Sequence, residues 1–296
     1  MLTRIISGAV GVALMVVVFI FHDTIFLPIA VAAMIAVMLF ELLRAVKLEK
    51  CLPILAAVEL CGISMPFIYE RYYYTDEDIA IIGGCTHVFK DGRVSFQAFG
   101  VVLLAAFVIF VTWLRKHKEI RYEQVFFALA SMTLVPQAMS SMVRIDRYSP
   151  DHGLFLLIMG LCGAWIADTG AYFTGVAIGK HKLCPEISPK KTIEGFVGGI
   201  VTTGTVYAAA FAIYNHNTDM ANLNFGGFVL IFFIGAACAV IGTIGDLSAS
   251  MVKRQIGFKD YGKIMPGHGG LMDRFDSVLF VLPAFYEFVV LTGIIE

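Results

Sequence analysis

Charged residues are scarce in this chain. Only 15% of its 296 residues are charged and 58% are hydrophobic, whereas soluble domains average about 25% charged and about 45–50% apolar. This composition excludes disordered, collagen-like and coiled-coil classes, and a soluble enzyme of this size could not bury so much apolar surface. The formal net charge of −1 gives no sign of a nucleic-acid partner. The class that remains is a multi-pass membrane protein.

Several common chemical motifs are also missing. The six cysteines form no Cys-x-x-Cys pair and most lie in apolar stretches, so neither a disulfide framework nor a zinc site is predicted. No phosphate-binding Walker motif, dinucleotide fingerprint, zinc-protease motif or nucleophile elbow occurs. The apolar runs are continuous rather than alternating, which argues against a transmembrane β-barrel.

Nine apolar windows predict an all-α polytopic membrane protein with about nine transmembrane helices, since each window is near the roughly 20 residues that a span needs. The windows are residues 5–21, 25–43, 51–69, 96–114, 125–143, 154–178, 196–214, 225–245 and 278–295. The first resembles a signal peptide, but no small-x-small cleavage site follows it, so we interpret it as a retained span. We predict one integral membrane unit, with N-terminal helices in residues 1–150 and a C-terminal catalytic region in residues 151–296.

Positive charge sets the orientation of the spans. With a cytoplasmic N-terminus, the cytoplasmic segments hold 17 of the 22 lysines and arginines, and the outer segments hold five. This asymmetry predicts a cytoplasmic N-terminus and an outer C-terminus in the inner, cytoplasmic membrane of the cell. Asp168 lies inside the sixth window, where an ionised carboxylate is costly, so it faces a cavity or a partner. The alternative for Asp168 is a structural hydrogen bond between helices.

The first unusual polar segment is residues 179–195, which the charge pattern makes cytoplasmic. Ser188 and Pro189 are typical of a helix start, with Ser188 as the cap and Pro189 in the first turn. Free N–H groups at a helix start suit a phosphate, and Lys190 and Lys191 add positive charge. The alternative is ordinary anchoring of the seventh span by lysines.

The second segment, residues 245–276, combines carboxylates, cations and glycines. On a helix, Asp246, Ser250 and Lys253 share one face. A glycine-rich turn follows at 266–270, and glycine lets a backbone approach a ligand closely. Carboxylates hold Mg²⁺, which bridges phosphate oxygens, while lysine and arginine neutralise the remaining charge. This inventory is typical of phosphoryl or nucleotidyl transfer, whereas a charged interfacial loop would explain neither the glycines nor the paired Asp residues.

At these residues the chain resembles the phosphatidate cytidylyltransferases, also called CDP-diacylglycerol synthases. The C-terminal signature of that family is matched over 27 residues by Ser250, Lys253-Arg254, Lys259-Asp260, Gly262, Pro266, His268-Gly269-Gly270, Asp273-Arg274 and Asp276. The segment with Asp168 and residues 188–192 is also similar to the family. Ala249 and Val176 stand where the family usually has Glu and Arg, which removes charge near the predicted site.

The resemblance implies that CTP and phosphatidate give CDP-diacylglycerol and pyrophosphate, with Mg²⁺, in phospholipid biosynthesis at the cytoplasmic face. The lipid phosphate is then the nucleophile, so no protein nucleophile is needed. Asp246 and Asp273 are the expected metal ligands, with Asp168 and Asp276 as further candidates. The expected catalytic residues are Asp246, Asp273, Lys253, Arg254 and Arg274. The expected substrate-binding residues are Ser188, Lys190, Lys191, Ser250, Lys259, Lys263, His268, Gly269 and Gly270. The family also suggests a homodimer, and a monovalent cation such as K⁺ beside Mg²⁺ stays open.

Three alternatives remain at this point. A related CTP-dependent enzyme could act on another lipid phosphate, such as that of an ether lipid. A transporter or scaffold without chemistry could also carry intramembrane charge. An intramembrane aspartyl protease would use Asp168 and Asp246, but Gly242–Asp246 is one residue too long for that family's Gly-x-Gly-Asp motif.

Overall fold

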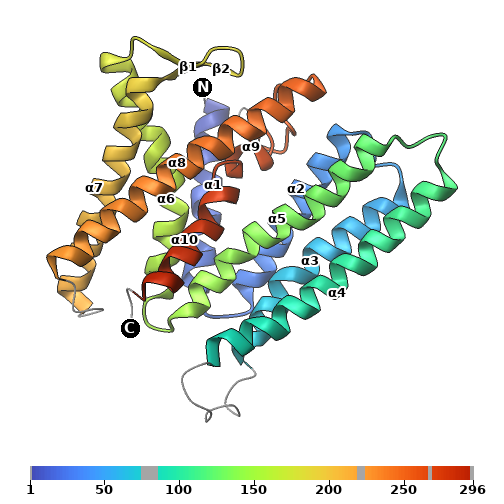
Figure 1. Ribbon diagram of the computed structural model, residues 1–296, viewed down its shortest axis with the longest axis horizontal. Helices are drawn as coiled ribbons and strands as arrows, with labels where there is room; N and C mark the ends of the chain where they lie inside the picture. Colours follow the sequence, from blue (N-terminus) through green and yellow to red (C-terminus); the bar gives the residue numbers. More distant parts are fainter. Residues whose placement is uncertain (1, 75–85, 219–223, 266–268, 294–296) are drawn as a thin grey trace. The chain divides into compact units, whose positions relative to one another are not determined.

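The computed structural model describes residues 2–74, 86–218, 224–265 and 269–293, and nearly all of their regular structure is helical (Figure 1). The elements are α1 (Leu2–Ile20), α2 (Phe26–Ala45), α3 (Leu52–Tyr74), α4 (Thr86–Arg115), α5 (Tyr122–Tyr148), α6 (Gly153–Ile178), β1 (Lys182–Cys184), β2 (Ser188–Thr192), α7 (Ile193–Thr218), α8 (Phe225–Ile256), α9 (Met272–Phe275) and α10 (Val278–Thr292).

Seven of the described helices, α2 to α8, contain segments long and apolar enough to cross a membrane. They confirm the predicted class, an integral all-α membrane protein. The first and last predicted spans coincide with shorter apolar helices, Ser7–Ile20 and Val278–Thr292. The total of nine spans and the orientation of the two termini therefore stay predictions.

The chain forms two compact units. The first contains Met1–Arg147 together with Asp260–Asp273, and the second contains Tyr148–Lys259 together with Arg274–Glu296. Each unit has its own apolar core, and each is described separately below.

In the first unit, α3 packs against α2 and α4. Leu27, Ile35 and Leu39 on α2 are fully buried. The α2–α3 packing is close at Gly62, where an added Cβ would overlap Leu39. Polar contacts support the apolar core, since the Gln124 side chain of α5 donates to the carbonyl of Val46 after α2 at 2.6 Å.

Buried charges join three segments at one end of this first unit. The Arg147 guanidinium on α5 donates to both carboxylate oxygens of Glu70 on α3, at 2.9 and 3.1 Å. It also pairs with Asp146, which in turn lies 2.7 Å from His22 Nδ1. The side chains of Arg147, Glu70 and Asp146 are at most 10% exposed. Because each buried charge has a partner, the network can be accommodated in an apolar surrounding.

In the second unit, α7 packs along both α6 and α8, and α10 packs against α6 and α8. Glycines allow the close approach of α6 and α7: a Cβ on Gly170 would lie 2.7 Å from Thr202, and one on Gly199 would lie 2.8 Å from the Ala167 carbonyl oxygen. Small residues at helix contacts of this kind are typical of membrane proteins. The Tyr207 hydroxyl, fully buried, donates to the carbonyl of Met159 at 2.7 Å.

The predicted helix start at Ser188 and Pro189 is wrong. Residues Ser188–Thr192 form strand β2, which pairs antiparallel with β1, and α7 begins only at Ile193. Ser-Pro also suits an extended edge strand, because the fixed φ of proline fits both conformations. The cap of α7 is instead Thr192, whose hydroxyl oxygen accepts from the Gly195 N–H at 3.1 Å.

Candidate functional site

Lys191 lies between two carboxylates in the second unit. Its Nζ is 2.6 Å from Asp246 Oδ2 on α8 and 3.9 Å from Asp168 Oδ1 on α6. The Lys191 and Asp246 side chains are 23% and 24% exposed, whereas Asp168 is 52% exposed. A lysine of strand β2 thereby contacts two transmembrane helices, at a point that water can still reach.

Local packing explains how Lys191 reaches α6. The hydroxyl oxygen of the next residue, Thr192, occupies the space beside Gly175, Gly179 and Gly195, so that a Cβ on any of them would lie 2.8 Å from it. Glu194 also accepts from the N–H groups of Lys180 and His181, at 3.1 and 3.2 Å. The two-stranded hairpin is therefore held against the end of α6, and Lys191 with it.

A second ion pair lies in the same unit. Lys253 Nζ on α8 is 3.7 Å from Asp276 Oδ2, and these side chains are only 11% and 9% exposed. Burial, and then the negative charge of Asp246, raise the pKa of the Asp276 carboxyl to about 7, although Lys253 opposes this shift. We call Asp168, Lys191, Asp246, Lys253 and Asp276 the carboxylate–lysine cluster. With every group ionised, it has three negative charges and two positive ones.

The length of α8 explains the position of this cluster relative to the apolar span. Its 32 residues extend for about 48 Å at 1.5 Å per residue, and a hydrocarbon core is only about 30 Å thick. The helix ends at Gly257, whose φ of +81° is the left-handed conformation of a C-cap. As predicted, Asp246 and Lys253 therefore lie on one continuous helix that is longer than a single membrane crossing.

The predicted residues Gly269, Gly270 and Asp273 belong to the first unit. Asp273 Oδ2 accepts from the N–H groups of Tyr261 and Gly270, at 2.9 and 3.0 Å. Gly269 has a φ of +88° and its carbonyl accepts from Met265 N–H at 3.0 Å. Gly269 and Gly270 thus lie beside the Asp273 carboxylate.

The other predicted residues are not all brought together. Ser188 and Ser250 are partly buried, and their predicted role in binding substrate stays a prediction. His268 lies outside the described residues. The remaining predicted cations are exposed: Lys190, Arg254, Lys259, Lys263 and Arg274. Of the two departures from the family pattern, Val176 is 71% exposed and Ala249 is 8% exposed.

The buried carboxylate of Glu41 was not identified from the sequence. Glu41 on α2 is 1% exposed, and its oxygens accept from the N–H groups of Leu271 and Met272, at 3.2 and 2.9 Å. The signal that could have found it is the one that singled out Asp168, a lone carboxylate inside an apolar window.

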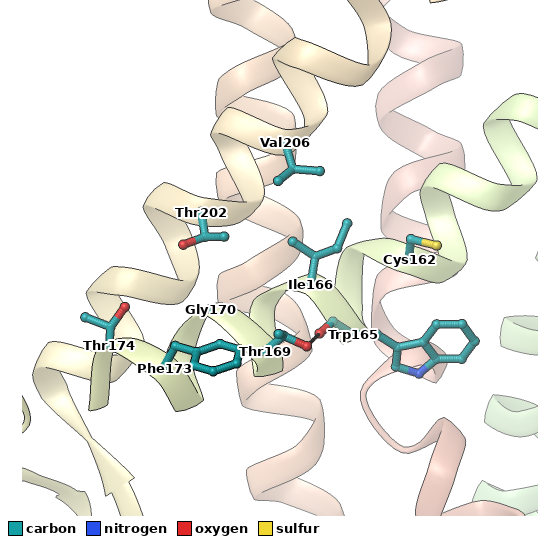
Figure 2. Close-up of a pocket in the computed structure, with 9 residues that line it drawn as sticks. All are labelled: Cys162, Trp165, Ile166, Thr169, Gly170, Phe173, Thr174, Thr202 and Val206. Atoms are coloured by element: carbon teal, nitrogen blue, oxygen red, sulfur yellow. Dashed lines mark hydrogen bonds between the residues drawn. The ribbon is translucent and has the colours of Figure 1, made fainter. Parts of the chain in front are cut away.

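A separate pocket of about 430 Å³ lies between α6 and α7 (Figure 2). Its lining is mostly apolar but includes threonine hydroxyls and one cysteine thiol: Cys162, Trp165, Ile166, Thr169, Gly170, Phe173, Thr174, Thr202 and Val206. These α6 residues recur at intervals of three and four and so share a helix face. Asp168 is not among them, so the pocket and the carboxylate–lysine cluster use different faces of α6.

Among the described side chains, no group of three or more His, Cys, Asp and Glu residues is arranged to hold a metal ion. The cluster therefore offers oxygen ligands but no closed protein cage.

Known proteins similar to this chain agree with these features. The sequence model of the family described as "Cytidylyltransferase family" matches residues 2–292. A phosphatidate cytidylyltransferase of Bacillus subtilis is 33% identical over 258 residues, which are 87% of this chain and 86% of that protein. A phosphatidate cytidylyltransferase of Haemophilus influenzae is 41% identical over 168 residues, 56% of either chain. One of Staphylococcus aureus is 45% identical over 132 residues, 45% of this chain and 48% of that protein. The aligned part thus spans about half of the Haemophilus influenzae and Staphylococcus aureus proteins and most of the Bacillus subtilis protein.

Proposed function

Because this chain belongs to the cytidylyltransferase family, we propose that it transfers the cytidylyl group of CTP to phosphatidate, giving CDP-diacylglycerol and pyrophosphate. An oxygen of the lipid phosphate attacks the α-phosphorus of CTP, and the bond from that phosphorus to the β-phosphate oxygen breaks. The phosphate oxygen is already ionised and nucleophilic, so the protein needs no covalent nucleophile or general base. Its tasks are to align two anionic substrates and to stabilise the charge that develops.

The observation that carries this proposal is the position of Lys191 between Asp168 and Asp246. Two polyanionic substrates approach each other only where cations offset their mutual repulsion. Lys191 and Lys253 supply two ammonium groups, and each is paired with a carboxylate in the absence of substrate. When substrate binds, these ammonium groups can turn from carboxylate to phosphate, and the carboxylates that they leave then need another cation.

We propose that the carboxylates hold Mg²⁺, with Asp246 as the central ligand. The fit rests on the donor chemistry: Asp246 Oδ2 already accepts a cation, the ammonium of Lys191, at 2.6 Å. Mg²⁺ commonly takes one or two carboxylates and completes its shell with waters and substrate phosphates. Bound Mg²⁺ would supply positive charge to the phosphate oxygens during transfer.

Asp273 stays the second proposed ligand, on the basis of the sequence. It precedes Asp276 by three residues, so the covalent chain alone keeps their Cα atoms within about 11 Å. One Asp273 oxygen accepts two backbone N–H groups, which fix the orientation of the carboxylate.

The proposed site is cytoplasmic in the proposed nine-span topology. Lys191 follows the sixth span and Lys253 follows the eighth, and the positive-inside rule assigns both loops to the cytoplasm. CTP is a water-soluble trianion or tetraanion that cannot enter hydrocarbon, whereas phosphatidate presents its phosphate at the interface. A site at the cytoplasmic interface of the inner membrane meets both requirements.

The test uses purified protein in detergent with radiolabelled CTP, phosphatidate and Mg²⁺, with and without a chelator. Metal-dependent transfer of label into the lipid extract, with release of pyrophosphate, is the expected result. Asp246→Asn should remove this transfer, whereas Asp151→Asn, in the exposed loop before α6, should keep it. Transfer to a different lipid phosphate in place of phosphatidate would favour the related-enzyme alternative. Absence of any CTP-dependent transfer would overturn the proposal.

A further inference from the structure

Glu41 on α2 is hydrogen-bonded to the backbone at the start of α9. Its carboxylate receives the N–H groups of Leu271 and Met272, two successive residues at the start of α9. Hydrogen bonds from backbone N–H to an ionised carboxylate are about twice as strong as neutral ones. They also fix orientation, because both oxygens of one rigid group are used.

Gly262 and Gly270 both pack against the same carboxylate. A Cβ on Gly270 would lie 2.5 Å from Glu41 Oε2, and a Cβ on Gly262 would overlap Glu41 Oε1. Neither glycine has a positive φ, so the reason for glycine at these positions is space rather than backbone conformation. A single side chain of α2 therefore accounts for two glycines located more than 220 residues later in the sequence.

The residues that contact Glu41 also lie next to Asp273. Gly270 lies against the Glu41 carboxylate, and its own N–H donates to Asp273 Oδ2. Met272, the second donor to Glu41, immediately precedes Asp273 in the chain. Movement of these residues away from Glu41 would therefore move the Asp273 carboxylate with them.

We propose that Glu41 is a positioning residue for the cytidylyl transfer: it holds the backbone of Leu271 and Met272 so that the next residue, Asp273, keeps a single orientation. This inference rests on the proposed function, in which the Asp273 carboxylate takes part in the reaction. Glu41 itself is only 1% exposed, so it is assigned no direct contact with substrate. Its effect is transmitted through the hydrogen-bonded backbone.

Amide hydrogen exchange of the full-length protein in detergent tests the clamp without any need for activity. The amides of Leu271 and Met272 should exchange slowly in the unaltered protein, and at least tenfold faster in Glu41→Ala. Glu41→Gln should be intermediate, because the amide oxygen still accepts one N–H whereas the NH₂ group cannot. Glu119→Gln, which changes an exposed carboxylate in the loop before α5, is the matched control and should alter neither amide.

Kinetics then test the positioning role. In Glu41→Ala, kcat should fall about 100-fold, since a displacement of about 1 Å at a reacting group has an effect of that size. The KM for phosphatidate should stay within about twofold, because the proposed role of Glu41 is to orient a reacting group and not to bind the lipid. A general loss of folded protein would instead lower the measured amount of active enzyme without changing the hydrogen exchange of the surviving molecules. The Gln variant should recover at least part of the lost kcat.

A second single substitution, Gly270→Ala, keeps the inference testable if Glu41→Ala does not fold. Gly270→Ala leaves Glu41 intact but forces its carboxylate aside, so it should reproduce the fast exchange and the low kcat. Combined with the shorter side chain in Glu41→Ala/Gly270→Ala, the Cβ has room, so the two losses should be strongly non-additive. Fast exchange with normal kcat, low kcat with unchanged exchange, or additive losses would each overturn the proposal. If the unaltered protein lacks cytidylyl transfer, the proposed function fails by itself, while the exchange data still decide whether Glu41 is a clamp.

Discussion

Replacing Lys191 by methionine should separate metal binding from catalysis. In the structure, the Lys191 ammonium occupies the position beside Asp246 Oδ2 that a metal ion would also need, at 2.6 Å. Methionine keeps the length and apolar stem of lysine but removes the charge. We expect Lys191→Met to bind Mg²⁺ more tightly than the unaltered protein when no nucleotide is present, and to turn over more slowly.

The magnitude follows from the burial of the pair. Exposed ion pairs contribute about 0.2–1 kcal/mol, and breaking a buried pair costs about 3–5 kcal/mol. Lys191 and Asp246 are 23% and 24% exposed, which places the pair between these limits. We take about 2 kcal/mol, which corresponds to about 30-fold in an equilibrium constant. The second carboxylate, Asp168, should add to the gain, because two like charges are left without a cation between them.

Isothermal titration of Mg²⁺ into nucleotide-free protein measures the affinity, and label transfer from CTP measures turnover. Lys182→Met, an exposed lysine on the same hairpin, is the matched control and should change neither quantity. Mg²⁺ affinity that is unchanged or weaker in Lys191→Met would refute the reasoning, because it would show that the lysine and the metal do not share Asp246.

Three further predictions concern packing, buried charge and topology. Gly170→Ala should lower the free energy of unfolding by about 1–3 kcal/mol, because the added methyl group overpacks against α7. The control, Gly100→Ala, has open space around its Cβ position and should be neutral or stabilising in thermal unfolding. Equal effects of the two substitutions would contradict the α6–α7 contact. Arg147→Met should lower the free energy of unfolding by about 3–5 kcal/mol, because it leaves the buried carboxylates of Glu70 and Asp146 without the guanidinium. A loss of less than about 1 kcal/mol, near the limit for surface substitutions, would contradict the network. In a cysteine-free background, a single cysteine at position 118 should react with impermeant maleimide only from the cytoplasmic side, and one at position 151 only from outside; the same side for both would disprove the proposed orientation.

Features set by local sequence were predictable. Continuous apolar runs identified the long helices, since a span must satisfy its backbone hydrogen bonds within itself. The helical period placed Asp246 and Lys253 on one face of α8, as found. Ser188 and Pro189 were misinterpreted because both residues are compatible with a helix start and with an edge strand, and the choice was decided by pairing with β1.

Features set by distant contacts were not predictable from the sequence. Nothing near Asp168 or Asp246 in the sequence indicates that Lys191 lies between them, because that contact depends on the glycines that admit Thr192. Glu41 was missed for the same reason: its acceptor role appears only when α2 and α9 are brought together. The proposed ligand Asp273 also has a structural role, as an acceptor for two backbone N–H groups, which a motif alone does not reveal.

The contact between Glu41 and Leu271 also has a consequence for the order of folding during synthesis. The two residues are 230 positions apart, so a ribosome working at about 5–20 residues per second needs about 10–50 s to make the second after the first. During that interval α2 has entered the membrane with a carboxylate whose partners do not yet exist. Such a helix is held less firmly among its neighbours until synthesis is nearly complete. The first unit therefore completes its packing only after the last loop has been synthesised. A chain truncated before residue 270 should be degraded by membrane proteases.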